Sequence, residues 1–457
     1  MKYDLVIKNG TVVTATSSVK ADLAIQGEKI AAIGAELRGE QEIDATGKLV
    51  IPGGVDVHVH LEMPIGNFTS SDDFFTGTRA AALGGTTAVI DFVEAKPDQP
   101  LLDALAARQA LANQRVAIDY GLHMTIGPND TGKLNQVADV VAAGCASFKL
   151  YMAYGLRLHD GQLLQAFQAI AKAGAIPVVH AENWDVIQAL TAQNLAQGNT
   201  QPRWHPRSRP APLEGEAAGR VIDIANYVGL PLHIFHVSCG DVVKRIAAAR
   251  TKGIDVTGET CPQYLLLTQD LYDRAGVEGT LPVCAPPLRT EADQLQLWQA
   301  LANNDLQLIA TDHCPFTRAE KATGLDDFTK IPGGVPSIES RLATTYHFGV
   351  RAGHLSLNRW VDLCATTPAR RLGFQNKGHL GVGYDADVVV FDPERPFALS
   401  PNTLHENVDW TPYDDLTGRG WPMMAISRGR VIVESVDGEN GRFVGEAGQG
   451  RFIHRKI

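Results

Sequence analysis

Val55-Asp-Val-His-Val-His60 is a short, largely apolar run with the length of a buried β-strand. Seven similar runs follow it, with amphipathic segments between them. Strands that alternate with helices favour parallel pairing and right-handed crossovers. Eight such strands between residues 55 and 313 match the size of a (β/α)8 barrel of the TIM type. The other seven runs are Thr87–Phe92, Ile118–Thr125, Ser147–Met152, Ile176–His180, Leu232–Val237, Ile254–Glu259 and Leu306–Thr311.

The segments between these runs are predicted helices. A doubly wound open sheet is the alternative architecture for such a pattern, but it would place a glycine-rich phosphate loop after the first strand. The sequence has no such loop there, so the barrel is preferred. The predicted helices are Thr76–Leu83, Leu101–Ala112, Gly161–Ala173, Gly215–Tyr227, Val242–Lys252 and Glu291–Ala302.

Both ends of the chain are rich in short predicted strands. Near the N-terminus, Asn9-Gly10 predicts a turn between the strands Asp4–Ile7 and Thr11–Thr14. Neither end alone has enough strands to bury a sheet face, so we expect one small β-sandwich built from both termini. The chain is thus predicted to be an α/β protein with a barrel of residues 53–374 and a sandwich of residues 1–52 plus 375–457.

Composition excludes several classes of protein. The 457 residues are 44% hydrophobic and 20% charged, which is typical of a folded chain with a large core. The net charge of −10 argues against nucleic acid as a partner. No apolar stretch approaches the ~18 residues that span a bilayer, so no membrane association is expected. Six cysteines without a CxxC pair argue against a disulfide scaffold, and the expected location is a reducing cytoplasm.

Histidines and an aspartate stand at the ends of several predicted strands. In a (β/α)8 barrel the C-terminal strand ends meet at one mouth, where functional groups gather. Each residue alone has a simpler explanation, such as a hydrogen-bonded core histidine or a helix cap. Their shared position at strand ends of the same polarity favours a metal site instead. The five candidate ligands are His58, His60, His180, His236 and Asp312.

The fourth predicted strand adds Lys149 to this group. Six groups are too many for one catalytic ion that keeps a position open, so two ions about 3.5–4 Å apart fit better. Imidazole and carboxylate without thiolate suit Zn²⁺, Mn²⁺, Co²⁺ or Fe²⁺. A protonated lysine would be repelled by two cations. Lys149 is therefore either a carbamate formed from CO₂ and the neutral amine, or a buried amine paired with a carboxylate.

Short motifs surround the candidate ligands and extend the pattern over nearly the whole chain. They are Pro52–His60, Gly84–Thr87, Ser147–Tyr154, Val179–Asn183, Phe235–Ser238, Glu259–Tyr264, Pro286–Arg289, Ala310–Pro315 and Lys377–Asp387. With these motifs the sequence resembles the hydantoinase/dihydropyrimidinase family of the amidohydrolase superfamily. The segment around the lysine and the Asp-His segment are the specific ones.

The resemblance implies a barrel flanked by a β-sandwich, usually in a homotetramer. It also implies hydrolysis of a small neutral cyclic amide, a hydantoin or a 5,6-dihydropyrimidine, to an N-carbamoyl amino acid. Two divalent metal ions are expected, with Zn²⁺ preferred and Mn²⁺ or Co²⁺ as alternatives. By position, His58, His60 and Asp312 would bind the more buried ion, His180 and His236 the other, and Lys149, as N6-carboxylysine, would bridge them.

The expected reaction begins with a hydroxide that bridges the ions and attacks the ring carbonyl. Asp312 would take its proton and deliver it to the leaving ring nitrogen. Tyr154 would stabilise the oxyanion, although it could instead be a packing aromatic. Ala285 and Gly333 stand where the family often has Ser or Thr and Asn. In the family these contacts to the ring use backbone groups, so both residues are expected to bind substrate.

Three segments follow the first, second and fourth strands and are expected to overhang the site. They should shape the pocket for the exocyclic group of the substrate. These segments are Leu61–Asp73, Glu94–Pro100 and Gly155–Gly161.

Other activities share this metal site. Dihydroorotases usually place Arg two residues after the second histidine to hold a carboxylate, and here that residue is Glu62, which would repel one. An allantoinase-type ureide hydrolase is the nearer alternative. The alternative of another class is a non-catalytic family member that keeps the fold but loses ligands. All six ligand positions are intact here, which argues against it.

Overall fold

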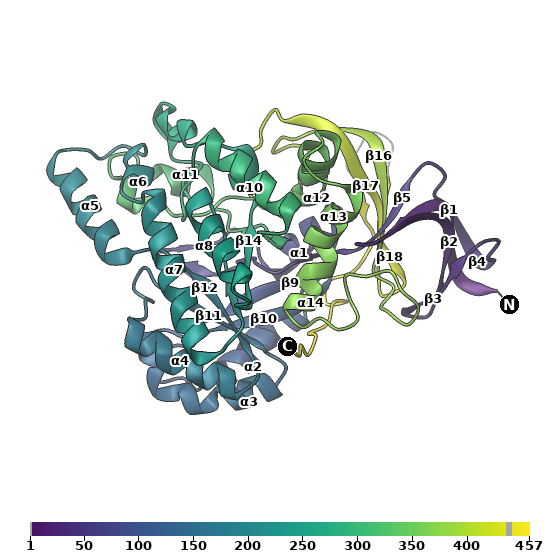
Figure 1. The fold of residues 1–457 in the computed structure, drawn as a ribbon. Coiled ribbons are helices and arrows are strands. Elements are labelled where there is room, and N and C mark those ends of the chain that lie inside the picture. Colours follow the sequence, from purple (N-terminus) through teal and green to yellow (C-terminus); the bar gives the residue numbers. More distant parts are fainter. Residues whose placement is uncertain (1, 436–440) are drawn as a thin grey trace.

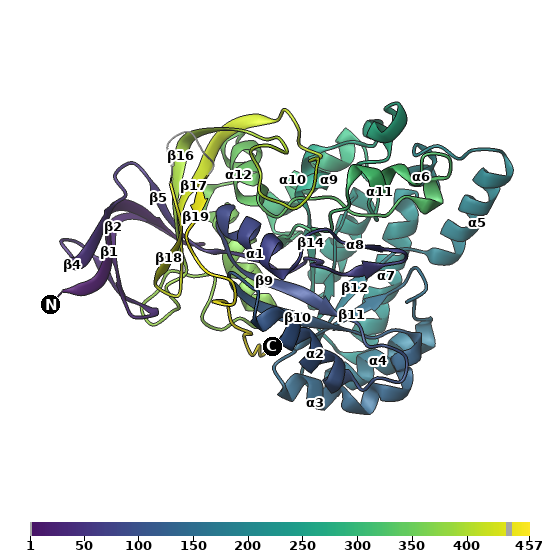
Figure 2. The ribbon, with the colours of Figure 1, turned by 180° about the vertical axis from the view of Figure 1, so that it is seen from behind.

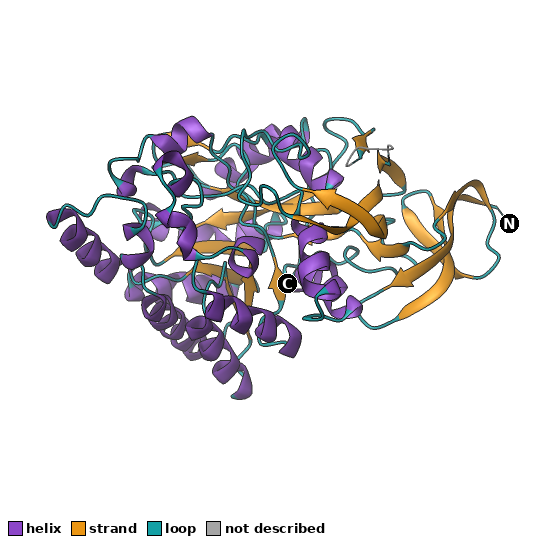
Figure 3. Ribbon diagram, turned by 90° about the horizontal axis from the view of Figure 1, so that it is seen from above, coloured by secondary structure: helices purple, strands orange, loops and turns teal. Residues whose placement is uncertain are grey.

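The structure is a computed structural model that describes residues 2–435 and 441–457. Two large sheets dominate it. An eight-stranded sheet lies among helices, and a nine-stranded sheet extends from it on one side (Figure 1, and from behind in Figure 2). Viewed from above, most helices gather around the first sheet, while the part near the N-terminus is almost entirely strand (Figure 3).

The eight-stranded sheet confirms the predicted barrel. Its strands pair in parallel and follow one another in chain order, as right-handed strand–helix–strand units require. All eight predicted strands are present, and several are shorter than predicted. The strands are β6 (Gly54–Asp56), β9 (Thr86–Val93), β10 (Asp119–Thr125), β11 (Ser147–Tyr151), β12 (Ile176–His180), β13 (Leu232–Ile234), β14 (Val256–Thr260) and β15 (Leu308–Ile309).

The barrel is nearly closed between β15 and β6, the two ends of the sheet, and a buried arginine links these strands. Arg341 donates hydrogen bonds to the carbonyl oxygens of Val55 at 3.1 Å and Ile309 at 2.8 Å, one from each strand. Asp56 accepts hydrogen bonds from the backbone and the hydroxyl of Thr311. These side chains replace the hydrogen bonds that two such short strands cannot supply to each other.

Helices form the outer layer, and the six predicted ones are all present. The helix α5 was not predicted because it buries only Ile187 and so lacks an apolar stripe. None of the helices in the described residues combines the length and apolarity needed to cross a bilayer. The α-helices are α1 (Phe74–Leu83), α2 (Leu101–Asn113), α3 (Val137–Ala142), α4 (Asp160–Lys172), α5 (Trp184–Ala196), α6 (Trp204–Arg207), α7 (Ala211–Val228), α8 (Gly240–Thr251), α9 (Pro262–Leu266), α10 (Glu291–Asn303), α11 (Arg318–Ala322), α12 (Arg341–Thr345), α13 (Leu357–Val361) and α14 (Thr367–Arg371).

Shorter elements connect these helices. They are the 3₁₀ segments η1 (Pro128–Gln136), η2 (Gln269–Asp273), η3 (Gly276–Gly279) and η4 (Phe328–Lys330), the π segments η5 (Tyr346–Arg351) and η6 (Asp362–Thr366), and the two-stranded ribbon of β7 (Pro64–Ile65) and β8 (Phe68–Thr69).

The nine-stranded sheet is built from both termini, as expected. Its two halves join where β5 pairs antiparallel with β16, with Val50 opposite Val390. Leu5, Ile25 and Ile426 belong to the separate apolar core of this sheet. The strands are β1 (Tyr3–Val13), β2 (Ser18–Gln26), β3 (Lys29–Gly34), β4 (Gly39–Asp44), β5 (Leu49–Pro52), β16 (Val388–Ala398), β17 (Thr417–Ser427), β18 (Arg430–Glu434) and β19 (Arg442–Phe443).

One local prediction in this sheet is wrong. Asn9-Gly10 does not end a strand, because β1 runs through it without a turn. Asn9 adopts a φ of 62°, and the pairing with β2 shifts register between Ile7 and Gly10. A positive φ at such a position usually belongs to a turn. In this strand it belongs to a β-bulge.

The inside of the barrel is apolar below the mouth. Val55, Ile90, Val178 and Leu308 belong to one buried cluster that fills it. Phe235 tops this cluster, and its ring centre lies 4.0 Å from that of His58. The predicted ligands therefore lie on a buried apolar surface, where charge interactions are stronger than in water.

Candidate metal centre

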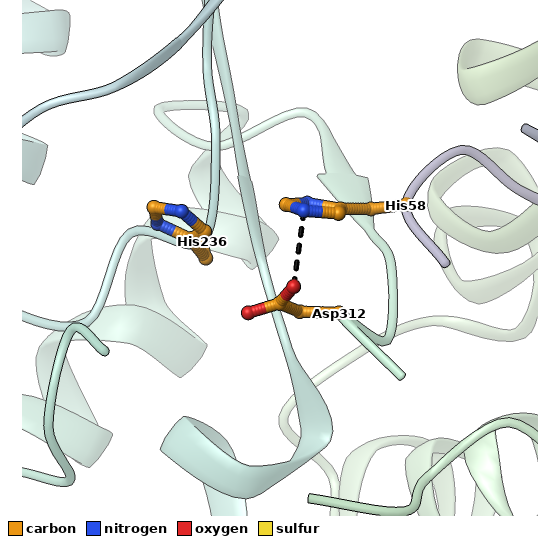
Figure 4. A group of neighbouring side chains, drawn as sticks. All are labelled: His58, His236 and Asp312. Atoms are coloured by element: carbon orange, nitrogen blue, oxygen red, sulfur yellow. Dashed lines mark ion pairs between the residues drawn. The ribbon is translucent and has the colours of Figure 1, made fainter. Parts of the chain in front are cut away.

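Three predicted ligands converge just beyond the C-terminal ends of β6 and β15. The Nε2 atoms of His58 and His60 lie 3.3 Å apart, and they are 3.0 and 3.1 Å from Asp312 Oδ1. Figure 4 shows the His58 ring beside the Asp312 carboxylate. The two histidines are buried and Asp312 is half-buried, so the group lies below the mouth of the barrel.

The other two histidines face this group. His180 ends β12, and its Nδ1 lies 2.9 Å from Nε2 of His236. One ligand atom each from His58, His236 and Asp312 lies within 4.8 Å of the others, and Figure 4 shows these side chains around a common space. The five histidine and aspartate side chains singled out from the sequence therefore form one cluster.

Lys149 lies beside the cluster, surrounded by aromatic rings. Its Nζ is 4.2 Å from the ring centre of Phe235, 4.7 Å from that of Tyr151 and 5.5 Å from that of Phe92. Among the residues that the structure describes, Lys149 has no carboxylate partner of the kind its simpler interpretation requires. Burial lowers the pKa of Lys149 to about 7, so much of the amine is neutral at neutral pH.

Two buried carboxylates decide which histidine nitrogens face the cluster. Glu259 accepts a hydrogen bond from Nδ1 of His58 at 2.5 Å, which leaves the Nε2 lone pair of the neutral ring toward Asp312. Glu182 accepts from Nε2 of His180 at 2.7 Å, which leaves Nδ1 toward His236. Partner carboxylates of this kind orient metal-binding imidazoles in proteins.

Both carboxylates are held ionised. Burial alone would raise the pKa of Glu259, but the adjacent His58 outweighs it and the pKa falls to about 2. Burial also opposes ionisation of Glu182, and the Arg209 guanidinium, which donates to it at 2.6 Å, holds its pKa well below the usual range. Each therefore stays a hydrogen-bond acceptor across the physiological pH range.

The cluster fits divalent cations. Asp312 Oδ1 lies about 3 Å from Nε2 of both His58 and His60, and contacts this short need a proton or a cation between the atoms. His236 Nδ1 is also buried without a hydrogen-bond partner in the described part of the chain. Imidazole nitrogens and a carboxylate, without thiolate, are donors that Zn²⁺, Mn²⁺ and Co²⁺ accept. This set of donors therefore fits divalent metal ions as cofactors.

The backbone at the mouth adopts an uncommon conformation at three of the predicted site residues. Tyr154, His236 and Asp312 have φ values of 67°, 39° and 52°, in the left-handed region that non-glycine residues rarely use. His236 lies two residues beyond the end of β13, so this turn, and not strand alternation, aims its ring at His180. Such conformations persist only where the surrounding structure enforces them.

Tyr154 lies next to the His180 side of the cluster. Its ring centre is 5.3 Å from that of His180 and 5.0 Å from that of Trp184. The Arg209 guanidinium lies 5.2 Å from the ring centre. Burial raises the pKa of Tyr154, so its hydroxyl stays protonated and can donate a hydrogen bond.

Ala285 and Gly333 lie on two loops that border the segment after Asp312. Val335 accepts from the backbone of Cys314, and Gly334 donates to Val283, so the two loops and this segment are adjacent. Ala285 is half-buried and Gly333 is exposed. A side chain added at Gly333 would meet no atom within 4 Å, so its surroundings leave room for a ligand.

Sequence reasoning missed the residues that support the ligands. Glu182 and Glu259 stand inside motifs already recognised, and Glu259 lies near the end of a predicted strand, so a strand-end criterion extended to all acidic residues would have found it. Arg209 lies between α6 and α7, and no pattern in the sequence points to it.

Comparison with known proteins agrees with this geometry. Residues 49–432 match the model of the amidohydrolase family. The chain is 43% identical to a D-hydantoinase of Geobacillus stearothermophilus over 98% of this chain and 96% of that protein. The structure superposes on a dihydropyrimidinase of Brevibacillus agri with a TM-score of 0.96 and 44% identity, covering 100% and 99% of the two chains.

A more distant solved structure is also similar along its whole length. It is an L-hydantoinase (dihydropyrimidinase) of Arthrobacter aurescens, with a TM-score of 0.91 and 32% identity over 99% of this chain and 100% of that one. Relatives named for D and for L specificity thus share this fold. Family model, sequence relatives and solved structures all cover the barrel and its metal cluster, and the chain belongs to the hydantoinase/dihydropyrimidinase family of the amidohydrolase superfamily.

Proposed function

We propose that this protein hydrolyses the ring amide of hydantoins or 5,6-dihydropyrimidines to give N-carbamoyl amino acids, with two divalent ions, most simply Zn²⁺. One observation carries the proposal. Two carboxylates orient the rings of His58 and His180, so that Nε2 of His58 faces Asp312 and Nδ1 of His180 faces His236. Nitrogen and oxygen atoms this close need a proton or a cation between them, and cations there would suit an open binuclear site.

His58, His60 and Asp312 would hold one ion, and His180 and His236 the other. When bound, the ions would polarise the ring carbonyl and lower the pKa of water to about 7. The two groups of ligands come from opposite sides of the mouth, and Lys149 lies between them in the order of strands. A group at that position could serve both ions.

Lys149 is proposed to supply that group as a carbamate. The nitrogen lone pair of the neutral amine adds to the carbon of CO₂, and one proton is released, which gives an anion with two oxygens. Three features support this: the amine is buried, it lacks a carboxylate partner in the described residues, and its pKa is lowered to about 7 by burial. An unmodified ammonium would instead repel the ions.

Asp312 and Tyr154 would act on the substrate directly. The pKa of Asp312 lies well below its usual range because His58 and His60 outweigh the effect of burial, so the carboxylate can accept a proton during attack. It can then return the proton to the leaving ring nitrogen, which becomes the terminal NH2 of the carbamoyl group in the product. Tyr154 keeps its proton and can donate a hydrogen bond to the carbonyl oxygen as negative charge develops.

A substrate panel tests the proposal. Protein reconstituted with Zn²⁺, Mn²⁺ or Co²⁺ is assayed with hydantoin, both enantiomers of 5-substituted hydantoins, dihydrouracil and allantoin, and bound metal is measured in each sample. We expect ring opening of hydantoins or dihydrouracil and its loss after chelation. Exclusive turnover of allantoin would favour the ureide hydrolase, and failure of every metal-loaded form would favour a non-catalytic relative.

The homotetramer implied by the family resemblance is part of the same proposal. Light scattering after size-exclusion chromatography tests it directly.

A further inference from the structure

Glu94 stands at the mouth of the barrel and has no assigned role. It follows the last residue of β9 directly, in the loop expected to contact the exocyclic group of the substrate. Its side chain is exposed, yet the surrounding protein is dense enough that burial raises the pKa of its carboxyl. An exposed side chain with a raised carboxyl pKa indicates that Glu94 lies on the wall of a recess.

The recess is a cavity of about 480 Å³ between the loop of Glu94 and helix α2, next to the metal cluster. Met63 and Phe92 line it together with Glu94. Met63 Sδ lies 3.1 Å from Nδ1 of His60, and the Phe92 ring stacks on the His60 ring with centres 4.4 Å apart. The charge of Glu94 also acts on Lys149 and on Tyr151, which places its carboxylate on the side of the mouth.

No cation neutralises Glu94 among the residues that the structure describes. Arg108 is the arginine whose charge acts on Glu94, but its guanidinium is bound to Asp91 at 2.6 Å and to the carbonyl oxygen of Leu61. Lys149 acts on Glu94 only through space. Glu62, the other acidic residue of the neighbouring loop, is by contrast paired with Arg115 at 2.6 Å.

Arg108 and Lys96 also line the recess, but neither forms an ion pair with Glu94 in the described part of the chain. Asp91 and Asp130 act on Glu94 as further negative charges. Asp130 is paired with Lys133 at 2.9 Å. Lys96 lines the cavity, and its backbone belongs to the tight turn closed by the Gln99 side chain, two residues farther along the loop.

We propose that Glu94 selects substrates whose exocyclic group carries a positive charge, such as hydantoins with an aminoalkyl or guanidinoalkyl chain at C5. The inference rests on the proposed function, because it places the ring carbonyl at the metal cluster. With the ring held there, a flexible chain at C5 can pass Met63 and Phe92, which contact His60, and bring its cation toward the carboxylate. An anionic chain would meet an unpaired charge of the same sign in a partly desolvated recess.

The test compares matched substrates in a single assay. They are 5-(4-aminobutyl)hydantoin, neutral 5-pentylhydantoin of similar length and anionic 5-(3-carboxypropyl)hydantoin. For the wild type, kcat/KM should be highest for the aminobutyl substrate and lowest for the carboxypropyl substrate. In E94Q the aminobutyl/pentyl ratio should fall about tenfold, mainly through KM, as expected for loss of one ion pair in a recess. In E94K the order of the charged substrates should reverse.

E62Q is the matched control, because Glu62 lies on a neighbouring loop but is already paired. Its aminobutyl/pentyl ratio should stay within about twofold of the wild type, as for other exposed ion pairs. An equal ratio in wild type and E94Q, with 5-pentylhydantoin still opened, would overturn the role of Glu94 alone. Failure of the wild type to open any of the three rings would overturn the proposed function and this inference with it.

Discussion

Lys149 is a buried amine in a ring of aromatic side chains, and an ammonium ion is costly in such a place. If it forms the bridging carbamate, K149M should lose both bound metal and ring opening. The loss of metal affinity should exceed the about 100-fold typical of residues that only orient ligands. Elemental analysis of the purified variant and turnover of hydantoin measure the two effects.

Lys321 offers a matched control for this substitution. It is also fully buried with its pKa lowered to about 7 by burial, but it donates a hydrogen bond to the carbonyl oxygen of Val283. K321M should keep its metal at the wild-type level even if its stability falls. Full metal content in K149M would refute the carbamate.

Asp312 combines two proposed tasks, ligand and proton carrier, and D312N separates them. The amide still offers an oxygen to a cation but cannot accept a proton, so turnover should fall about 10²–10⁴-fold even at full metal occupancy. Single-turnover kinetics on protein with measured metal content checks this. Turnover within tenfold of the wild type at equal occupancy would rule Asp312 out as the base.

At the scale of residues, the sequence located the groups that face the mouth but not those behind them. His58 and His180 could be found because strand ends meet at one rim. Glu182 and Arg209 support His180 through contacts set by loop geometry, which no short-range pattern records. Glu94 is similar: its position was expected to face substrate, but its lack of a partner is visible only in three dimensions.

At the scale of elements, Arg341 is one of the side chains that link β6 to β15. Arg341 is fully buried and binds the carbonyl oxygens of Val55 and Ile309, with the Asp56 carboxylate 3.8 Å away. R341M would remove the donor to both carbonyl oxygens and leave the buried Asp56 carboxylate without its nearby cation, although Thr311 would still donate to it. We expect the free energy of unfolding to fall by about 3–5 kcal/mol, the usual result of breaking a buried pair.

Urea denaturation followed by tryptophan fluorescence measures this change. R351M is the control, because Arg351 pairs with Glu394 at the surface and such pairs contribute less than about 1 kcal/mol. Similar losses in both variants would show that Arg341 does not hold β6 and β15 together.

Periodicity predicted the elements that have strong patterns and failed for those that depend on distant contacts. The eight barrel strands are short apolar runs set between helical segments, and helices such as α7 carry a clear period. The helix α5 buries almost nothing, and the turn expected at Asn9-Gly10 became a bulge because β2 pairs along the whole of β1. The outer strand β4 was also missed: its residues are mostly exposed, and it is placed by parallel pairing with β1.

At the scale of the whole molecule, a buried ion network joins the barrel to the terminal sheet. Lys377 lies 2.7 Å from Asp119 at the start of β10, and 2.6 and 3.1 Å from Asp387 and Asp385 just before β16. Arg428 adds a contact to Asp119 at 3.2 Å. The three carboxylates could suggest another metal site, but the Lys377 amine already binds all three of them. The sequence placed these residues in two predicted domains, and only the fold shows that they meet.

This network should contribute to the stability of the whole protein. K377M would leave three carboxylates, two of them fully buried, with the half-buried Arg428 and the exposed Lys29 as the remaining cations, so the free energy of unfolding should fall by about 3–5 kcal/mol. K29M removes a half-exposed partner of the same Asp385 and should cost less than about 1 kcal/mol. Urea denaturation of the two variants at equal metal content compares them directly. Removing a buried cation that balances three carboxylates should lower the free energy of unfolding far more than removing one surface ion pair. Equal and small losses in both variants would therefore mean that Lys377 only fills space between the domains.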